Sequence, residues 1–258
     1  MPLSLDLDGR VALVTGGTRG VGLGITQVLV EAGAAVVTCS RSEAEPVGGA
    51  AGHIACDVRD PASVESLVRQ VVEVHGRIDV VVNNAGGAPY ALAADASPRF
   101  HAKVVELNLL APLLVSQAAN AVMQEQDEGG VIVMVSSISA TRPSPGTAAY
   151  GAAKAGLDSL ARSLAVEWAP RVRVNAVDVG LVRTEQTDLH YGGEAGVEAI
   201  ERTVPLGRLA GPRDVGNVVA FLASPLAGYV SGAVVAAHGG GEPPPFLAAA
   251  ESRSERNP

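Results

Sequence analysis

The segment RVALVTGGTRGVG, residues 10–22, gives the strongest indication of how this chain folds. It starts with a short apolar run, typical of a buried strand, and passes into a turn in which Gly16, Gly20 and Gly22 follow the spacing G-x-x-x-G-x-G. The residues after the turn place apolar side chains at helical spacing and stop at Gly33. Strand, glycine-rich turn and helix in this order predict a nucleotide-binding unit, because glycines let the backbone approach a pyrophosphate at the helix N-terminus.

Strand-like and helix-like segments alternate along the rest of the chain. This alternation predicts a single doubly wound, Rossmann-like α/β domain, with a parallel sheet of about seven strands and helices on both faces. Residues 1–258 are expected to form one domain, with a core at about 8–240 and a Pro-rich tail at 241–258. No helix is expected in the loop 41–52. The expected strands are 10–15, 35–40, 53–57, 78–86, 130–137, 172–180 and 229–240, and the expected helices are 21–33, 61–75, 100–126, 148–169 and one that begins at Pro212.

The composition agrees with such a sheet and argues against several classes of partner. Of the 258 residues, 47% are apolar and only 3% aromatic, so the core must consist of Val, Ala, Leu and Ile. The net charge of −8 argues against nonspecific binding to nucleic acid or to an anionic membrane. Neither a signal peptide nor a membrane-spanning run is expected. The two cysteines, Cys39 and Cys56, are interpreted as free buried thiols of a cytoplasmic protein rather than a disulfide or metal site.

The end of the second expected strand bears on which dinucleotide is bound. An NAD site usually has an acidic residue there, which binds the ribose 2′-hydroxyl. Here the strand ends TCSRSE (38–43), so Ser40 and Arg41 come first and no carboxylate precedes Glu43. Arg19 lies within the glycine turn itself. Two guanidinium groups can bind one 2′-phosphate, so the sequence favours NADP(H) over NAD(H), although each arginine alone could be an ordinary surface residue.

A second segment, SSISATRPSPGTAAYGAAK (136–154), predicts a proton-transfer site. Lys154 follows Tyr150 by four residues, and side chains at that spacing share one face of a helix. A nearby cation favours the phenolate, so we expect Lys154 to lower the pKa of Tyr150. A serine pair stands just upstream, at Ser136 and Ser137. Each residue alone has an ordinary structural explanation, and the prediction depends on their occurring together.

Taken with these segments, the sequence resembles the short-chain dehydrogenase/reductase (SDR) superfamily over about residues 8–240. The resemblance implies an oxidoreductase acting on CH–OH and C=O groups, with Tyr150 as general acid and base. It also implies that Ser137, rather than Ser136, holds the substrate oxygen, and that Asn108 joins a water-linked proton path to Lys154. The matching motifs, in order, are TGGTRGVG (15–22), CDV (56–58), NNAG (83–86), Asn108, SS (136–137), YGAAK (150–154) and VNAVDVGLVRT (174–184).

The resemblance further implies which residues contact the cofactor, and it exposes two departures. Val179 stands where members of the superfamily usually have the proline of a Pro-Gly pair. His238 stands where an Asp commonly precedes the C-terminal glycine pair. No metal ligand is expected. The implied contacts are Gly16, Thr18, Arg19, Gly20, Val21, Ser40, Arg41, Asp57, Val58, Asn84, Ala85, Gly86, Tyr150, Lys154, Gly180, Val182 and Thr184.

The substrate is indicated only by the loops expected to line its pocket, 87–93, 139–147 and 185–202, which are mixed in character. They predict a medium-sized, largely apolar ketone or secondary alcohol. One alternative is a 3-oxoacyl reductase acting on acyl-carrier-protein or CoA thioesters; another is a non-catalytic NADPH-binding regulatory protein. Surplus apolar residues on the helices 100–126 and 148–169, together with the resemblance, imply a homodimer or homotetramer.

Overall fold

The computed structural model describes residues 5–185, 187 and 193–243. Its seven strands form one parallel sheet in the order β3-β2-β1-β4-β5-β6-β7, which confirms the predicted single doubly wound α/β domain. The last strand is shorter than expected, because Gly232 and Gly239 on either side of it take positive φ angles of 77° and 67°. The strands are β1 (Val11–Thr15), β2 (Ala35–Ser40), β3 (Gly52–Ala55), β4 (Val80–Asn83), β5 (Gly130–Val135), β6 (Val172–Val179) and β7 (Val234–Ala237).

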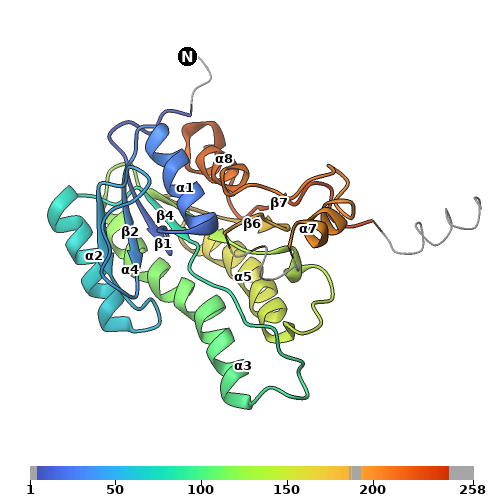
Figure 1. Cartoon of the computed structure of the whole chain (residues 1–258). Helices are drawn as coiled ribbons and strands as arrows, with labels where there is room; N and C mark the ends of the chain where they lie inside the picture. The colour runs from blue at the N-terminus through green and yellow to red at the C-terminus, as the bar shows by residue number, and fades with distance from the viewer. Residues whose placement is uncertain (1–4, 186, 188–192, 244–258) are drawn as a thin grey trace, which may run out of the picture.

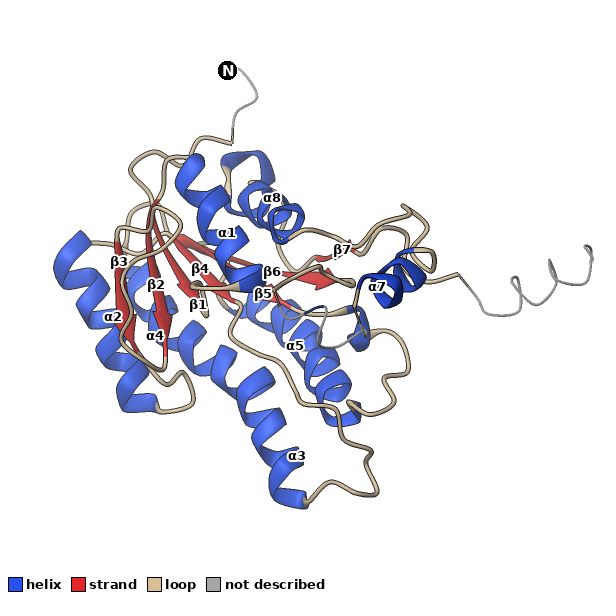
Figure 2. Ribbon diagram, viewed as in Figure 1, coloured by secondary structure: helices blue, strands red, loops and turns tan. Residues whose placement is uncertain are grey.

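Helices cover both faces of the sheet, as Figures 1 and 2 show. The helices α1 (Gly20–Glu31) and α8 (Pro212–Ala223) lie on one face, and α2 (Pro61–His75), α4 (Ala111–Glu125) and α5 (Ala148–Glu167) lie on the other. The remaining helical segments are α3 (Pro98–Val105), the π-helical turn η1 (Glu106–Leu110), the 3-10 turns η2 (Ile138–Ala140) and η3 (Pro225–Ala227), and α7 (Glu194–Glu201).

Alternate side chains of each central strand enter opposite cores, which explains why these strands read as continuous apolar runs. Leu13 of β1 packs with α2, α4 and α5, whereas its neighbour Val14 packs with α1 and α8. Burying both faces with aliphatic side chains contributes roughly 25 cal/mol per Å² of apolar surface removed from water. The loop 41–51 contains no helix, as expected, and its glycines lie against α1, where a Cβ on Gly48 would come within 2.9 Å of Leu23.

The strand order reverses direction next to β1, and this reversal fixes where a ligand can bind. From β1 the chain adds β2 and β3 on one side and then crosses to β4 on the other side. In open α/β sheets, the loops after two such strands separate and leave a crevice at their carboxyl ends. The glycine-rich turn follows β1, and the segment 84–87 follows β4, so both predicted cofactor segments border this crevice.

The expected helix 100–126 is present but is interrupted by a π-helical turn. Pro112 lacks an N–H, so it cannot donate to the carbonyl four residues earlier, and the Ala111 N–H bonds to Glu106 instead. By length and hydropathy, Pro98–Glu125 could also span a bilayer. Val115 and Met123 of this segment are buried against the sheet, which identifies it as a core helix.

Candidate active site

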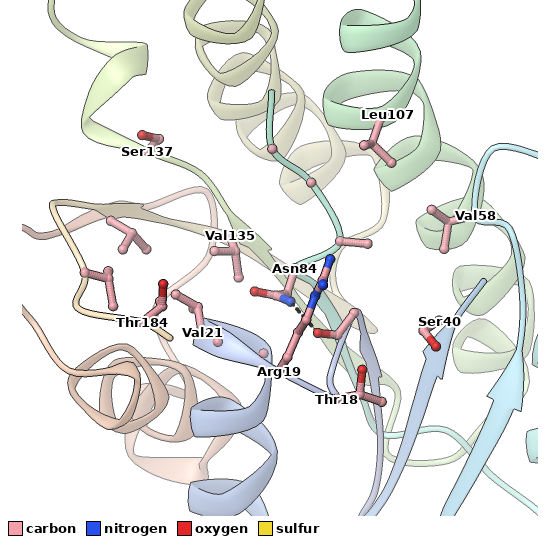
Figure 3. Close-up of a pocket in the computed structure, with 18 of the residues that line it drawn as sticks. Thr18, Arg19, Val21, Ser40, Val58, Asn84, Leu107, Val135, Ser137 and Thr184 are labelled. Atoms are coloured by element: carbon pink, nitrogen blue, oxygen red, sulfur yellow. Dashed lines mark hydrogen bonds between the residues drawn. The ribbon is translucent and has the colours of Figure 1, made fainter. Parts of the chain in front are cut away.

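One cleft of about 760 Å³ lies at the carboxyl ends of the strands, and every predicted cofactor contact lines it. Figure 3 shows Ser40 and Val58 toward one end, Ser137 and Thr184 toward the other, and Asn84 between them. The cleft is therefore long enough for the predicted cofactor contact Ser40 and the predicted catalytic residue Ser137 to lie toward opposite ends. Its lining also includes residues that the sequence did not single out as contacts, namely Gly22, Cys39, Ser42, Cys56, Arg59, Gly87, Leu107, Val135, Ser136, Val179, Leu181 and Glu185.

The glycine turn is held by a network that leaves no space for larger residues. A Cβ on Gly22 would lie 2.1 Å from the Gly16 carbonyl oxygen and 2.5 Å from Asn84 Nδ2. Asn84 Nδ2 donates to the carbonyls of Thr15 and Gly16, at 2.9 and 3.1 Å. The Thr15 hydroxyl oxygen in turn accepts from the backbone N–H of Asn84 and of Ala85, both at 3.0 Å. The turn after β1 and the segment after β4 are thereby locked together.

The N-terminus of α1 already binds an anionic group. The Gly20 N–H donates to Glu185 Oε1 at 3.1 Å, and the first turn of the helix contains no acidic residue. Free N–H groups and the positive end of a helix dipole favour negative charge at this position. The geometry of the turn therefore suits a pyrophosphate.

The cleft is lined by three arginines rather than the two that were predicted. Arg59 binds Asp57 through two side-chain hydrogen bonds of 2.9 and 2.6 Å, which lowers the pKa of that carboxyl to about 2. Arg19 and Arg41 also line the cleft, and neither forms an ion pair with any described residue. Ser40 also lines the cleft and donates from its hydroxyl to the Ser42 carbonyl at 3.0 Å.

At the opposite end, the two adjacent serines point to different sides of the chain. Ser137 and Tyr150 both line the cleft, and the Ser137 hydroxyl oxygen accepts from the Ser139 N–H at 3.2 Å as the N-cap of η2. Ser136 is buried and donates to the Lys154 carbonyl at 3.3 Å. The two serine hydroxyls therefore have different partners, and that of Ser136 is bound to the backbone of α5.

Lys154 is buried below Tyr150 on the same face of α5. Its Nζ donates to the Val135 carbonyl at 2.7 Å and lies 5.6 Å from the centroid of the Tyr150 ring. Burial lowers the pKa of Lys154 to about 8, and the nearby carboxyls of Asp158 and Asp178 oppose that change.

The expectation that Lys154 lowers the pKa of Tyr150 is wrong for this arrangement. Burial raises the pKa of the phenol, and only the hydrogen bond from Ser137 acts in the opposite direction. The physical reason is placement, because the ammonium group lies over the ring face and is bound to the Val135 carbonyl. A buried phenol of this kind keeps its proton until a reaction demands it.

Asn108 is fully buried beneath the segment 84–87 and does not line the cleft. It therefore makes no direct contact with the space where a substrate would react. Its side chain accepts from the Gly87 N–H at 2.8 Å and donates to the carbonyls of Gly87 and Val104 at 2.9 and 2.8 Å. A Cβ on Gly86 would lie 2.7 Å from Asn108 Oδ1 and 3.5 Å from Lys154 Nζ. Asn108 and Lys154 are therefore neighbours on either side of Gly86. Asn108 lies on the π-helical turn η1, and Pro112 just after it is the sequence signal for that interruption of the helix.

The two departures from the family pattern both lie where β6 and β7 end. Val179 is buried and pairs with Ala237, and Gly180 donates its N–H to the Ala237 carbonyl at 3.1 Å. A Cβ on Gly180 would lie 2.7 Å from the His238 Cα, so a glycine is required at that position. His238 Nδ1 is buried and has no hydrogen-bond partner among the described residues.

Two of the three predicted substrate loops pack together beside Tyr150. The Ala91 N–H donates to the Gly146 carbonyl at 2.8 Å, and a Cβ on Gly146 would collide with the Tyr90 ring. In the third loop, residues 186 and 188–192 lie outside the described residues. Residues Glu194–Glu201 of that loop form the helix α7 rather than an irregular segment.

Comparisons with known proteins agree with this fold and cleft. A family model described as enoyl-(acyl carrier protein) reductase matches residues 16–242. The chain is 36% identical to a 3alpha-hydroxysteroid dehydrogenase of Mediterraneibacter gnavus, over 90% of this chain and 97% of that protein. It is 35% identical to the 3-oxoacyl-(acyl-carrier-protein) reductase FabG of Vibrio cholerae, over 92% and 98% of the two chains. A solved short-chain dehydrogenase/reductase of Serratia marcescens, 31% identical, superposes with a TM-score of 0.82 and covers 91% of this chain and 98% of its own.

Fold and cleft together define a dinucleotide-binding α/β oxidoreductase that acts on CH–OH and C=O groups. The chain belongs to the short-chain dehydrogenase/reductase superfamily, whose members bind a nicotinamide cofactor. The resemblance seen in the sequence motifs is thus confirmed.

Proposed function

We propose that this protein is an NADP(H)-dependent reductase or dehydrogenase that interconverts a medium-sized, largely apolar ketone and its secondary alcohol. One observation carries the proposal: Ser137, Tyr150 and Lys154 line the same cleft as the glycine turn and the arginines Arg19 and Arg41. A bound nicotinamide dinucleotide supplies the hydride, and the chain supplies position and the proton.

The residues around the cleft suit such a cofactor. The glycine turn and the α1 N-terminus would hold the pyrophosphate, as the contact between Gly20 and the Glu185 carboxylate indicates. Val58 and the carboxylate of Asp57 would contact the adenine, and Lys154 would donate to the nicotinamide ribose. The segments that would border the nicotinamide are Asn84, Ala85 and Gly86 after β4, and Gly180, Val182 and Thr184 after β6.

Proton transfer follows from the placement of three side chains. Tyr150 gives its proton to the substrate oxygen during reduction and takes it back during oxidation. The Ser137 hydroxyl would hold that oxygen beside the phenol, because both groups line the same cleft. Asn108, across Gly86 from Lys154, fixes the backbone through which a water-linked path would reach Lys154.

The preference for NADP(H) rests on uncompensated charge. Arg19 and Arg41 form no ion pair with a described residue, while the third arginine, Arg59, is engaged by Asp57. A 2′-phosphate would give both free guanidinium groups a dianionic partner, which NAD(H) lacks.

The test is a panel of ketones and secondary alcohols followed by nicotinamide absorbance, run with both NADPH and NADH. We expect turnover of apolar carbonyls with NADPH and at least tenfold lower kcat/KM with NADH, which corresponds to about 1.4 kcal/mol. A clear preference for NADH would contradict the role given to Arg19 and Arg41.

A second candidate is a 3-oxoacyl thioester reductase, favoured by the 35% identity to a 3-oxoacyl-(acyl-carrier-protein) reductase. Carrier proteins are acidic, so docking requires a basic surface near the site. The segment after α4 instead carries Glu125, Asp127 and Glu128, and Glu128 is bound by Arg10 and Arg77. Measuring acetoacetyl thioester reduction on carrier protein, on CoA and on a simple ester separates the candidates, since a carrier-protein enzyme would prefer the first by a large factor.

A non-catalytic NADPH sensor is the remaining alternative. It would bind NADPH but turn over no member of a broad carbonyl panel. The placement of Ser137, Tyr150 and the buried Lys154 around one cleft favours an enzyme, because a binding protein needs no phenol beside an ammonium group. Leu110 and Val166 are exposed apolar residues, 48% and 80% accessible, and they support the proposal of a homodimer or homotetramer. The two free thiols support the proposal of a cytoplasmic location.

A further inference from the structure

A short chain of hydrogen bonds lies at the end of β2, next to the residues proposed to bind the 2′-phosphate. His53 of β3 pairs with Thr38 of β2 in the parallel register of the two strands. Its Nδ1 lies 3.0 Å from Thr38 Oγ1, and its Nε2 lies 3.2 Å from Ser40 Oγ and 3.0 Å from the Ser42 carbonyl oxygen. Ser40 and Ser42 line the cleft, whereas His53 is not part of the cleft lining. The histidine therefore contacts the cleft wall from behind.

The Ser42 carbonyl determines which ring nitrogen of His53 carries a proton. A carbonyl oxygen and an unprotonated ring nitrogen are both acceptors, and two acceptors 3.0 Å apart would repel each other. Nε2 must therefore carry a hydrogen and donate it to the Ser42 oxygen. Nδ1 then accepts from the Thr38 hydroxyl or, in the doubly protonated ring, donates to Thr38 Oγ1 while that hydroxyl donates to the Gly52 carbonyl at 3.4 Å. The Nε2–H donor is the same in both forms.

The Ser40 hydroxyl competes with His53 for the same carbonyl oxygen. It donates to the Ser42 carbonyl at 3.0 Å. A hydroxyl has a single proton, so a serine that donates to the backbone has none to give to a ligand. Because the Nε2–H of His53 supplies the Ser42 oxygen with a second donor, the Ser40 hydroxyl can turn toward the cleft and that oxygen keeps a partner within the protein.

Thr38 holds the ring in this orientation. Thr38 is fully buried, so the hydroxyl that contacts Nδ1 has little freedom to move. Its methyl group packs against the glycine turn, where a Cβ on Gly17 would lie 2.6 Å from Thr38 Cγ2. A ring whose Nδ1 is bound on this side presents Nε2 to the turn after β2. The direction of the Nε2–H donor is therefore set by the fold, without a bound cofactor.

We propose that His53 is a positioning residue for the 2′-phosphate of NADP(H): by donating from Nε2 to the Ser42 carbonyl, it frees the Ser40 hydroxyl to donate to the phosphate. This inference rests on the proposed preference for NADP(H). It goes beyond that preference, because the two arginines supply charge whereas His53 sets the direction of a neutral donor. The sequence does not indicate this role, since His53 lies in the strand segment HIACD (53–57), thirteen residues after Ser40.

Two nucleotides that differ only in the 2′-phosphate, 2′,5′-ADP and 5′-AMP, serve as probes, and their binding to the full chain is measured by calorimetry. His53→Gln and His53→Asn form a matched pair, because a glutamine amide N–H reaches about as far as Nε2, whereas an asparagine amide reaches only about as far as Nδ1. Ser40→Ala removes the proposed phosphate donor itself. His75→Asn, which changes a histidine of α2 outside the cleft lining, is the control.

In the wild type we expect 2′,5′-ADP to bind more tightly than 5′-AMP. His53→Asn should weaken 2′,5′-ADP about three- to tenfold, the range for one neutral hydrogen bond, and leave 5′-AMP within about twofold. His53→Gln should retain most of the affinity, and His75→Asn should retain all of it. Equal losses for both probes, or a glutamine variant as weak as the asparagine variant, would overturn the proposal.

Because His53 is proposed to act through Ser40, the effects of the two changes should not add. Once Ser40→Ala has removed the hydroxyl, a further His53→Asn change should weaken 2′,5′-ADP by less than about twofold. A merely structural role of His53 would weaken binding whether or not the Ser40 hydroxyl is present. Losses that multiply in the double variant would therefore overturn the proposal.

A measurement on the wild type keeps the test decisive even if a variant does not fold. Long-range ¹H–¹⁵N NMR of protein labelled in its five histidines distinguishes a protonated Nε2 from an unprotonated one without any cofactor. We expect a protonated Nε2 for His53, and a ring protonated only at Nδ1 would overturn the proposal. If the wild type bound both nucleotides equally well, the proposed NADP(H) preference would fail. A wild-type preference that persists in His53→Asn would overturn only the role of His53.

Discussion

The two ends of the cleft are built on opposite physical principles. The cleft lining includes Arg19 and Arg41, which form no ion pair with a described residue, and Ser40 lies toward one end of the cleft. The end near Ser137 uses buried groups, with Lys154 3% accessible and Asn108 inaccessible. Exposed charge acts over a distance that salt limits, whereas buried groups act through contact, desolvation and altered pKa values. Selectivity for the cofactor and proton transfer should therefore respond to different perturbations.

The sharpest way to separate the two ends is Tyr150→Phe. Removing the phenol oxygen removes the proton donor, and a positioned acid or base contributes about 10²- to 10⁴-fold to rate. We expect kcat to fall by that factor while the NADPH dissociation constant, measured by fluorescence titration, changes less than about threefold. A matching loss of NADPH affinity would show that the two ends are not independent.

The complementary change is the double variant Arg19→Ala and Arg41→Ala. Hydrogen bonds to charged groups contribute about 1.5–3 kcal/mol, so NADPH should bind roughly 10- to 100-fold more weakly while NADH binding hardly changes. The difference in NADPH affinity between the wild type and the double variant should become smaller as the salt concentration rises. Arg69→Ala, which removes an exposed arginine of α2, is the control. Equal losses for NADPH and NADH would contradict a 2′-phosphate site.

Above pH 7, the pH dependence of kcat should come from the buried Lys154 alone. Lys154 has a pKa of about 8, so its charge is present below that pH and is lost as the pH rises through it. We expect kcat for ketone reduction to fall above about pH 8, whereas NADPH binding through the arginines persists. In Lys154→Arg the group stays charged at every working pH. A residual rate in that variant with no decline above pH 8 would support the assignment, and an unchanged decline would refute it.

The smallest effect is expected for Ser97→Ala, a variant that lowers the stability of the fold without touching the cleft lining. It tests whether a general loss of stability alone changes cofactor binding or turnover. The Ser97 hydroxyl caps α3 by accepting from the Phe100 N–H at 3.2 Å, and Ser97 is not part of the cleft lining. Ser97→Ala should cost about 1 kcal/mol in the free energy of unfolding, measured by denaturant titration. Cofactor affinity and kcat should not change, and a change in either would mean that α3 influences the cleft.

Much of the site could be predicted from single segments because local chemistry specifies it. The steric need for Gly22 and the helical spacing of Tyr150 and Lys154 are visible in the chain itself. Three features could not be predicted in this way. The pKa of Tyr150 depends on burial, Asn108 reaches Gly87 through a π-helical turn, and Arg59 binds Asp57 where only Arg19 and Arg41 had been expected to act. Each depends on which groups the fold brings into contact or removes from water.

By itself the sequence determined the alternation of strands and helices, the glycine turn after the first strand and the order of the family motifs. Periodicity and backbone freedom are local properties, so residues near in sequence are sufficient to show them. Only the tertiary structure decided that Ser137 and Tyr150 line the same cleft while the buried Ser136 hydroxyl donates to the Lys154 carbonyl. Contacts between distant segments depend on how the sheet and helices pack, and charge states depend on the solvent that this packing excludes.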